Sequence, residues 1–159
     1  MIVSNTTPLI NFYSIERLDI LEKLFSKIII PEAVAKEIKE KEKKFQGVED
    51  VLNSNFIEVQ KIHNDTFSNN LKIDLDEGEA EAIVLAKELN TRLILLDELS
   101  ARSLSKYHEL NALGTIGCLI LAKEKNIITM IKPFLDGIRE KGNFWIKETL
   151  YQSIISRYE

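Results

Sequence analysis

The sequence contains one cysteine, no long hydrophobic run and no excess of positive charge. The lone Cys118 cannot form a disulfide within the chain, and its apolar neighbours predict a small buried residue. No apolar run approaches the roughly 20 residues that cross a bilayer, and the N-terminus has no basic region followed by an apolar stretch. We therefore expect a cytoplasmic protein with no membrane partner.

The net charge of −4 gives no overall attraction for nucleic acid, so such a partner requires a local basic patch. One candidate is the stretch KEIKEKEKK from Lys36 to Lys44, either a solvated helix end with internal ion pairs or a basic flank for a phosphate backbone. His63 and His108 lack metal-ligand spacing, and we expect both to be exposed. A glycine-rich phosphate loop and a Ser/His/Asp or Cys/His set are also absent from the sequence.

The chain is organised around the stretch Asp76–Arg102, DEGEAEAIVLAKELNTRLILLDELSAR. It opens with acids, continues as a helical segment, and ends in the apolar run Leu93–Leu96, a pattern typical of a buried parallel strand. A helix that precedes a parallel strand runs back across the sheet. Roughly 12 helical and 5 strand residues both span about 16–18 Å. Glu79 and Asp97 should therefore be neighbours at the carboxyl edge of the sheet, where open α/β sheets place their ligand sites.

Short apolar strands and helices alternate along the rest of the chain. We expect strands near residues 1–4, 28–30, 56–59, 93–96 and 111–113, and a long polar connection at 61–73. Asp97 should cap a helix over residues 98–107. This order predicts an α/β fold, a three-layer α/β/α sandwich with a mainly parallel central sheet. We expect a single domain over residues 1–159, with a C-terminal helical extension from about residue 129.

Three carboxylates and one amide are expected to converge at the carboxyl edge, namely Glu37, Glu79, Asp97 and Asn5. Acids held close together raise one another's pKa unless a cation neutralises them. Hard divalent ions such as Mg²⁺ or Mn²⁺ take such oxygen ligands, and they stabilise charge on a reacting phosphodiester. The pattern therefore favours a Mg²⁺ or Mn²⁺ site.

Each of these residues also has a purely structural explanation. Glu79 lies in a first helical turn, where a negative charge is favourable without any metal. Asn5 and Asp97 are good helix caps, and Glu37 can pair with nearby lysines. The metal interpretation depends on the four residues taken together.

Five segments occur in order along the chain: IVSNTTPLI, IIIPEAVAKEI, DEGEAEAIVLA, LLDELSAR and LGTIGCLILAKEKNII. Together they resemble PIN-domain proteins, and in particular a prokaryotic PIN-like group related to VapC toxins. The resemblance extends to about Leu135. It implies an α/β/α sandwich whose acidic quartet binds Mg²⁺ or Mn²⁺ and cuts RNA, and it places that quartet at Asn5, Glu37, Glu79 and Asp97.

Two positions depart from the PIN pattern. Asn5 stands where an active PIN nuclease usually has Asp; its amide oxygen can still ligate a metal, but the site loses one negative charge. Thr115 provides a hydroxyl where some PIN relatives carry another acid, and it can orient a water or simply begin a helix. Arg102 and Lys106, one turn apart beyond the quartet, can meet a phosphate or pair with acids at 98 and 109.

The resemblance implies a metal-dependent endoribonuclease, the toxin half of a toxin–antitoxin pair. Its expected partners are RNA, a small antitoxin protein and a second copy in a homodimer. The alternative is a non-catalytic PIN-like module that binds RNA or protein, with a metal site weakened by Asn5. A small-molecule phosphatase ranks last, because Asp97 is not followed by an acid two residues later.

Overall fold

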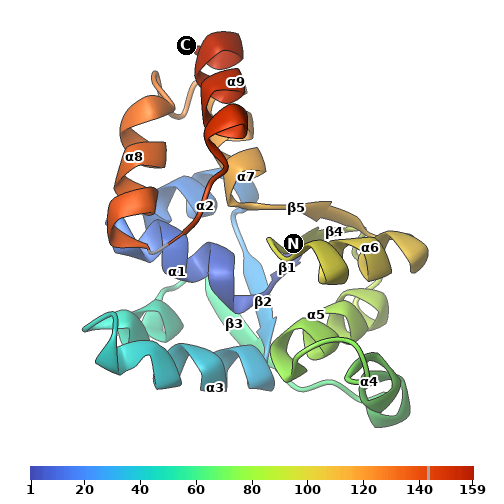
Figure 1. Ribbon diagram of the computed structural model, residues 1–159. Helices are drawn as coiled ribbons and strands as arrows, with labels where there is room; N and C mark the ends of the chain where they lie inside the picture. The colour runs from blue at the N-terminus through green and yellow to red at the C-terminus, as the bar shows by residue number, and fades with distance from the viewer. Residues whose placement is uncertain (143) are drawn as a thin grey trace.

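A five-stranded parallel sheet lies at the centre of the computed structural model, which describes residues 1–142 and 144–159 (Figure 1). The strand order is β3-β2-β1-β4-β5, and every neighbouring pair is parallel. The sheet is flanked by helices on both faces, which confirms the predicted α/β/α sandwich. The strands are β1 Ile2–Ser4, β2 Ile28–Pro31, β3 Ile57–Gln60, β4 Leu93–Leu95 and β5 Asn111–Leu113.

The strand side chains alternate between two hydrophobic clusters. Val3 pairs with Ile29 on one side and Ile94 on the other, and all three side chains enter the same cluster. Successive side chains of a strand point to opposite faces, so their sequence neighbours enter the second cluster. Because both faces are buried, these strands are continuously apolar, which is why the sequence predicts them well. The residues of the opposite face include Ile2, Ile28, Ile30 and Leu95.

Nine α-helices and two 3₁₀ turns are found in the described residues, and none of these helices has both the length and the apolar character of a membrane span. Helices α4, α5 and α6 lie on one side of the sheet, and α1, α2 and α8 lie on the other (Figure 1). The elements are α1 Thr6–Ser14, α2 Leu18–Phe25, α3 Glu32–Glu40, η1 Lys41–Lys43, η2 Val48–Asn53, α4 Asp65–Leu71, α5 Glu77–Glu88, α6 Leu99–Tyr107, α7 Thr115–Glu124, α8 Lys132–Lys141 and α9 Glu148–Tyr158.

The C-terminal helices α8 and α9 share a core with the beginning of the chain. Leu135 and Ile138 of α8, and Ile154 of α9, belong to the same cluster as Phe12 of α1 and Ile28 of β2. Figure 1 shows α8 and α9, in orange and red, next to α1 and α7. Burial of these apolar side chains therefore holds α8 and α9 against the helices, such as α1, that cover this face of the sheet.

The polar connection expected at residues 61–73 contains a helix, α4, so that expectation was wrong. The Asn64 side chain caps α4 by accepting a hydrogen bond from the Phe67 backbone N–H at 3.0 Å. Leu71 is buried and Phe67 packs against the same cluster. An asparagine cap and two apolar residues four positions apart were the available signals.

Cys118 is buried, as predicted, and burial raises the pKa of its thiol. The side chain of His63 is 89% exposed, also as predicted. The expectation for His108 was wrong. Its ring is half-buried between Phe67 and Tyr107, with ring centroids 5.0 and 5.1 Å away. Burial lowers the pKa of His108.

Candidate functional site

The carboxyl edge of the sheet has a switch point between β1 and β4. The connection after β1 leads to β2, whereas the connection after β4 leads to β5 on the opposite side. Ligand sites of open α/β sheets form at such a point. Asn5 directly follows β1, and its backbone N–H donates to the Leu95 carbonyl oxygen at 3.0 Å. The sheet thus places Asn5 beside Leu95, the last residue of β4, and Asp97 follows Leu95 by two residues.

Asn5 occupies the N-cap position of α1 but does not cap it through its side chain. The residue is 3% exposed. Among the residues that the structure describes, its Oδ1 atom has no hydrogen-bond partner. An unpaired buried acceptor costs about 1–3 kcal/mol. The helix-cap explanation therefore does not account for Asn5, and its oxygen is available to a ligand.

Glu37 reaches from α3 to the beginnings of two other helices. Its carboxylate accepts a hydrogen bond from the Thr6 hydroxyl and another from the Gly78 backbone N–H at 3.1 Å. Burial raises the pKa of Glu37, while the bond from Thr6 acts in the opposite direction. Within the described residues Glu37 forms no salt bridge, so the expected pairing with lysines is not found. One carboxylate therefore joins the starts of α1 and α5.

The close approach of Glu37 to α5 depends on a glycine. A Cβ atom at Gly78 would lie 2.6 Å from Glu37 Oε2 and 2.7 Å from its carboxyl carbon. Both distances are shorter than real Cβ contacts, so any larger residue displaces the carboxylate. Gly78 is therefore required for the position of Glu37 rather than for an unusual backbone conformation.

We expect Gly78→Ala to displace Glu37 without unfolding the protein. Helix propensity alone favours Ala over Gly by about 1 kcal/mol in a helix interior, whereas the clash removes both hydrogen bonds to Glu37. When Glu37 is present, the two effects on the free energy of unfolding should nearly cancel. When Glu37→Ala has removed the carboxylate, Gly78→Ala should stabilise the protein. Urea unfolding of the two single variants and the double variant measures this coupling. An equal effect of Gly78→Ala in both backgrounds would contradict it.

Glu79 forms a capping box with Asp76 at the start of α5. The Glu79 backbone N–H donates to Asp76 Oδ1 at 2.8 Å, and the Asp76 backbone N–H donates to Glu79 Oε2 at 3.2 Å. Glu79 is 6% exposed. Burial raises its pKa to about 6, with further contributions from the charges of Asp76, Glu98 and Glu37. Glu79 thus stabilises the start of α5 through the capping box, and its carboxylate also lies near other acids.

Glu81 lies on a different face of α5 and has a different partner. It accepts a hydrogen bond at 3.0 Å from the backbone N–H of Ala33, in the first turn of α3. Residues two apart on a helix point about 200° away from each other. Of these two acids, only Glu79 lines the hollow at the sheet edge.

Metal-free protein should lose stability as the pH rises, and Glu79 should be one cause. Its pKa is about 6 in the folded chain against 4.5 for an unperturbed glutamate, so the folded state binds the proton more tightly. The stabilising contribution is complete below pH 4.5 and is lost as the pH rises through 6. Urea unfolding in chelator from pH 4 to 7.5 should therefore show Glu79→Gln gaining stability relative to wild type as the pH rises. A constant difference between the two proteins would refute this origin.

A hollow of about 440 Å³ gathers most of these acids. Its lining includes three predicted residues, Asn5, Glu37 and Glu79. It also includes three acids that the sequence analysis did not assign to the site, Glu40, Asp76 and Glu98, of which Glu98 directly follows the predicted Asp97. We call it the acidic hollow; its lining residues are Asn5, Thr6, Thr7, Glu37, Glu40, Lys41, Asp76, Glu79 and Glu98.

Asp97 lies beside the acidic hollow, in an adjoining groove. Its Oδ1 accepts from the Thr115 backbone N–H and its Oδ2 from the Thr115 hydroxyl, both at 2.7 Å. Burial raises the pKa of Asp97, whereas the Thr115 bonds and the charge of Arg102 oppose this shift. Asp97 therefore caps α7 from a distance. It does not cap α6 as predicted, because α6 begins at Leu99 with Glu98 as its N-cap residue.

Thr115 begins α7, one of the two roles expected for it. Its hydroxyl also accepts a hydrogen bond from Asn11 Nδ2 at 3.0 Å, so Thr115 connects Asp97 to α1. Glu98 and Thr7 line both the acidic hollow and the groove that contains Asp97. The charge of Glu98 raises the pKa of both Glu79 and Asp97, so this acid acts on both sites.

The structure brings the predicted quartet to one edge but not around one point. Within residues 1–142 and 144–159, no three His, Cys, Asp or Glu side chains are close enough to hold a metal ion together. The donor set nevertheless fits a hard divalent ion. Mg²⁺ is commonly held by one or two carboxylates and several waters. Asn5 supplies a buried unpaired oxygen, and Glu79 and Glu37 supply carboxylates in the same hollow.

Of the two predicted phosphate contacts, only Arg102 lies at this edge. A Cβ atom at Gly114 would lie 2.8 Å from Asp97 Oδ1 and 3.1 Å from Arg102 Nη1, so the guanidinium is next to Asp97. Lys106 is exposed on α6 and lines neither the acidic hollow nor the adjoining groove. In the described part of the chain neither residue forms a salt bridge, so the expected pairing with Glu98 and Glu109 is not found.

The charged stretch Lys36–Lys44 contains the end of α3 and the turn η1. The internal ion pairs expected there are not found in the described residues. Instead, the Glu42 carboxylate accepts hydrogen bonds from backbone N–H groups of Gly47 and Glu49, at 2.7 and 3.1 Å. Lys41 is the one basic residue of the stretch that lines the acidic hollow.

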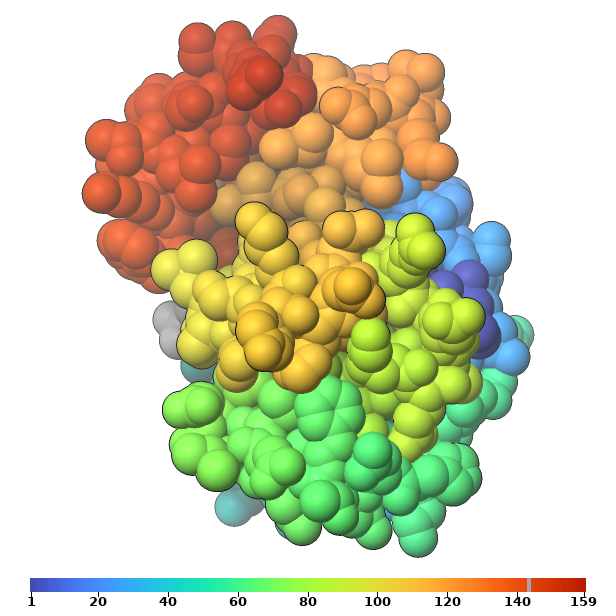
Figure 2. Space-filling model, turned by 90° about the vertical axis from the view of Figure 1, so that its right-hand side faces the viewer, coloured from blue at the N-terminus to red at the C-terminus, as the bar shows by residue number. Residues whose placement is uncertain are grey.

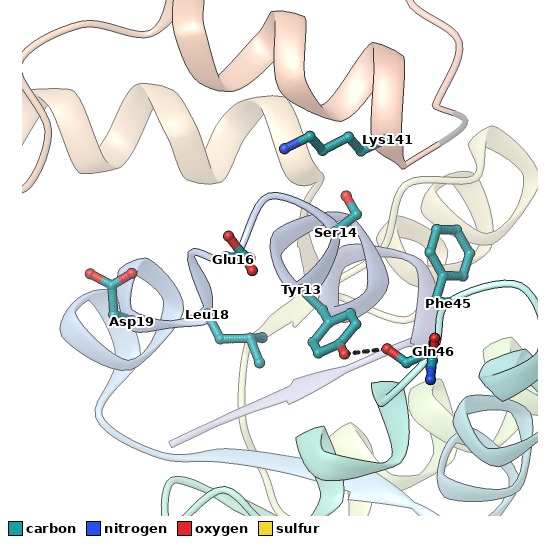
Figure 3. Close-up of a pocket in the computed structure, with 8 residues that line it drawn as sticks. All are labelled: Tyr13, Ser14, Glu16, Leu18, Asp19, Phe45, Gln46 and Lys141. Atoms are coloured by element: carbon teal, nitrogen blue, oxygen red, sulfur yellow. Dashed lines mark hydrogen bonds between the residues drawn. The ribbon is translucent and has the colours of Figure 1, made fainter.

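Another pocket, of about 570 Å³, involves none of the predicted residues (Figure 3). It is lined by residues of α1, α2, α8 and the loop after η1. The Tyr13 hydroxyl donates to the Gln46 carbonyl oxygen at 2.6 Å. The Arg17 guanidinium holds the pKa of Asp19, on its rim, at about 2. Among the described residues that line this pocket, none has a buried side-chain oxygen without a hydrogen-bond partner, in contrast to Asn5 in the acidic hollow.

Comparison with known proteins gives one family. A family model described as a PIN domain matches residues 1–159. This match extends beyond Leu135, where the resemblance seen in the sequence ends. No curated protein matches the chain.

Proposed function

Because the chain belongs to the PIN-domain family, a fold of nuclease type, we propose that it is a metal-dependent endoribonuclease of the VapC toxin type. It would hydrolyse RNA phosphodiester bonds with Mg²⁺ or Mn²⁺. The observation that carries this proposal is the acidic hollow at the switch point, where the buried and unpaired Asn5 Oδ1 lies among carboxylates. Such oxygen atoms are the ligands that hard divalent cations favour.

In this proposal each residue has a separate task. Asn5 and Glu79 bind the ion, and Glu37 completes the oxygen donors while Thr6 and Gly78 fix its orientation. When bound, a divalent ion activates water and offsets the negative charge that develops on the phosphodiester. Asp97, held through both oxygens by Thr115, adds negative charge at the edge of the hollow. Arg102 faces this edge and can pair with a phosphate.

A second candidate is a non-catalytic PIN-like module that binds RNA or protein. Two observations favour it. Asn5 contributes no charge where an acid would strengthen the site, and in the described residues no three acids converge on one point. A weak or absent metal site is the result that this alternative predicts.

One experiment separates the two functions. Purified protein is incubated with single-stranded RNA in Mn²⁺, in Mg²⁺ and in chelator, and its melting temperature is measured under the same conditions. The nuclease proposal expects cleavage only with metal, and stabilisation that follows RT ln(1 + [L]/Kd), about 2.7 kcal/mol at 100 times Kd. RNA binding without cleavage or metal stabilisation supports the module. The absence of both RNA binding and cleavage would reject the nuclease and the RNA-binding form of the module.

We extend the proposal to a cytoplasmic toxin that acts as a homodimer and is neutralised by a small antitoxin protein. This extension is supported by the resemblance of the five segments to VapC-related proteins. Growth arrest on expression, relieved by a small protein encoded next to this gene, is the expected result. A monomer by light scattering would reject the homodimer, and expression without effect on growth would reject the toxin.

A further inference from the structure

A groove of about 610 Å³ opens beside Asp97 and continues from the acidic hollow through Thr7 and Glu98. We call it the Trp145 groove. Its walls come from α6, the start of α7, and the segment that leads into α9. Figure 2 shows α6, in yellow, next to the red C-terminal segment on one face of the molecule. The side chains that matter here are those of Leu99, Arg102, Phe144, Trp145, Lys147 and Leu150.

Three of the apolar side chains that line the groove are exposed. Trp145 and Leu99 are each 81% exposed, and Leu150 is 47% exposed. Single exposed apolar residues are common, but several that line one groove indicate a binding surface. Exposed aromatic rings in the grooves of nucleic-acid-binding proteins act as platforms on which bases stack.

Two cations lie on the same groove. Arg102 and Lys147 are exposed, and in the described part of the chain neither forms a salt bridge. The same groove is also lined by the acids Asp97 and Glu98, so the two cations lie next to the candidate metal site. Such a combination matches a nucleotide, whose phosphate is an anion and whose base is an apolar plane.

We propose that the Trp145 groove binds one nucleotide of a single-stranded RNA, next to the candidate cleavage site. The base stacks on Trp145, and its phosphate meets Arg102 and Lys147. Single strands fit because a stacked base must be free of its pairing partner. The choice of RNA rests on the proposed ribonuclease function. A second protein copy could cover Leu99 and Leu150, but it would leave the two cations and the continuity with the acidic hollow unexplained.

Trp145 is the only tryptophan of the chain, so its fluorescence reports directly on the groove. The full-length protein is titrated with a short single-stranded RNA in chelator, where no cleavage is expected. Saturable quenching of the emission is the expected result, and a duplex of the same sequence should quench less. Labelled-RNA anisotropy should show that Trp145→Ala weakens binding roughly 5- to 150-fold, and that Trp145→Phe retains most of the affinity. Lys147→Ala should weaken binding and reduce its dependence on salt.

Matched controls lie outside the groove. Tyr107→Ala removes another aromatic ring that is 80% exposed, and Lys125→Ala removes an exposed lysine; both should bind RNA like wild type. If RNA leaves the emission of the wild-type protein unchanged and Trp145→Ala binds RNA as tightly as wild type, while cleavage continues, the groove proposal is overturned and the nuclease proposal stands. Quenching without metal-dependent cleavage would support the groove and reject the nuclease. Emission that changes with protein concentration alone, and not with RNA, would overturn the proposal by assigning the groove to a second copy.

Discussion

Glu79→Gln is expected to abolish Mn²⁺ binding and to lower RNA hydrolysis by at least roughly 10²-fold. Glutamine has nearly the same size, and its amide oxygen can still accept the hydrogen bond from the Asp76 backbone N–H. The substitution therefore removes the charge and leaves the capping box in place. A metal ion supplies several kcal/mol of transition-state stabilisation, and each 1.36 kcal/mol is tenfold in rate. Calorimetry with Mn²⁺ and gel analysis of RNA cleavage give the two measurements.

Glu81→Gln is the matched control for this result. It removes the same charge two residues later, but Glu81 bonds to Ala33 of α3 on another face. We expect Mn²⁺ affinity and cleavage close to those of wild type. Lower Mn²⁺ affinity in Glu81→Gln, together with an unchanged affinity in Glu79→Gln, would show that the wrong acid has been chosen.

Asn5→Asp is expected to change the sign of its effect on stability when metal is added. The residue is 3% exposed, and it shares the acidic hollow with Glu79 and Glu37. In chelator, a further buried carboxylate among these acids should cost several kcal/mol and lower the melting temperature. In Mn²⁺ the added charge strengthens the site, so the melting temperature and the rate of RNA cleavage should both rise above wild type.

The alternative for Asn5 predicts a different outcome. If Asn5 has only a structural role at the start of α1 and takes no part in metal binding, Asn5→Asp should show the same response to Mn²⁺ as wild type. Asn5→Ala serves as the second comparison, since it removes the unpaired Oδ1 without adding charge. Identical Mn²⁺ responses of wild type, Asn5→Asp and Asn5→Ala would remove Asn5 from the metal site.

The sheet was predictable from the sequence because its strands are buried on both faces. A short, continuously apolar run such as Ile28–Ile30 is typical of a buried parallel strand. Helical spacing of apolar residues on either side of such runs indicated that strands and helices alternate along the chain. The convergence of Asn5 and Glu79 followed from the same geometry. The helix α4 was missed because it is polar and short, so periodicity gave little signal, although the Asn64 cap was visible.

What could not be predicted were the contacts between residues distant in sequence. Nothing in the sequence near Asp97 indicates that it binds Thr115 rather than the helix that follows it. The role of Gly78 is visible only when Glu37 arrives from a helix 41 residues earlier. Similarly, Trp145 gave no periodic pattern, and its exposure became apparent only once the end of the chain was placed beside α6.

The bond between Asp97 and Thr115 also has a consequence for the order in which the chain folds. The residue before α7, Gly114, has no side chain to cap it, so the first turn of α7 depends on a carboxylate 18 residues earlier. Asp97 follows β4 and Thr115 follows β5, so the pairing of these two strands brings the carboxylate to its donors. We therefore expect the start of α7 to gain protection from amide hydrogen exchange late in refolding, after the strands. A nascent chain that has emerged only as far as β5 would hold an Asp97 carboxylate without its two donors.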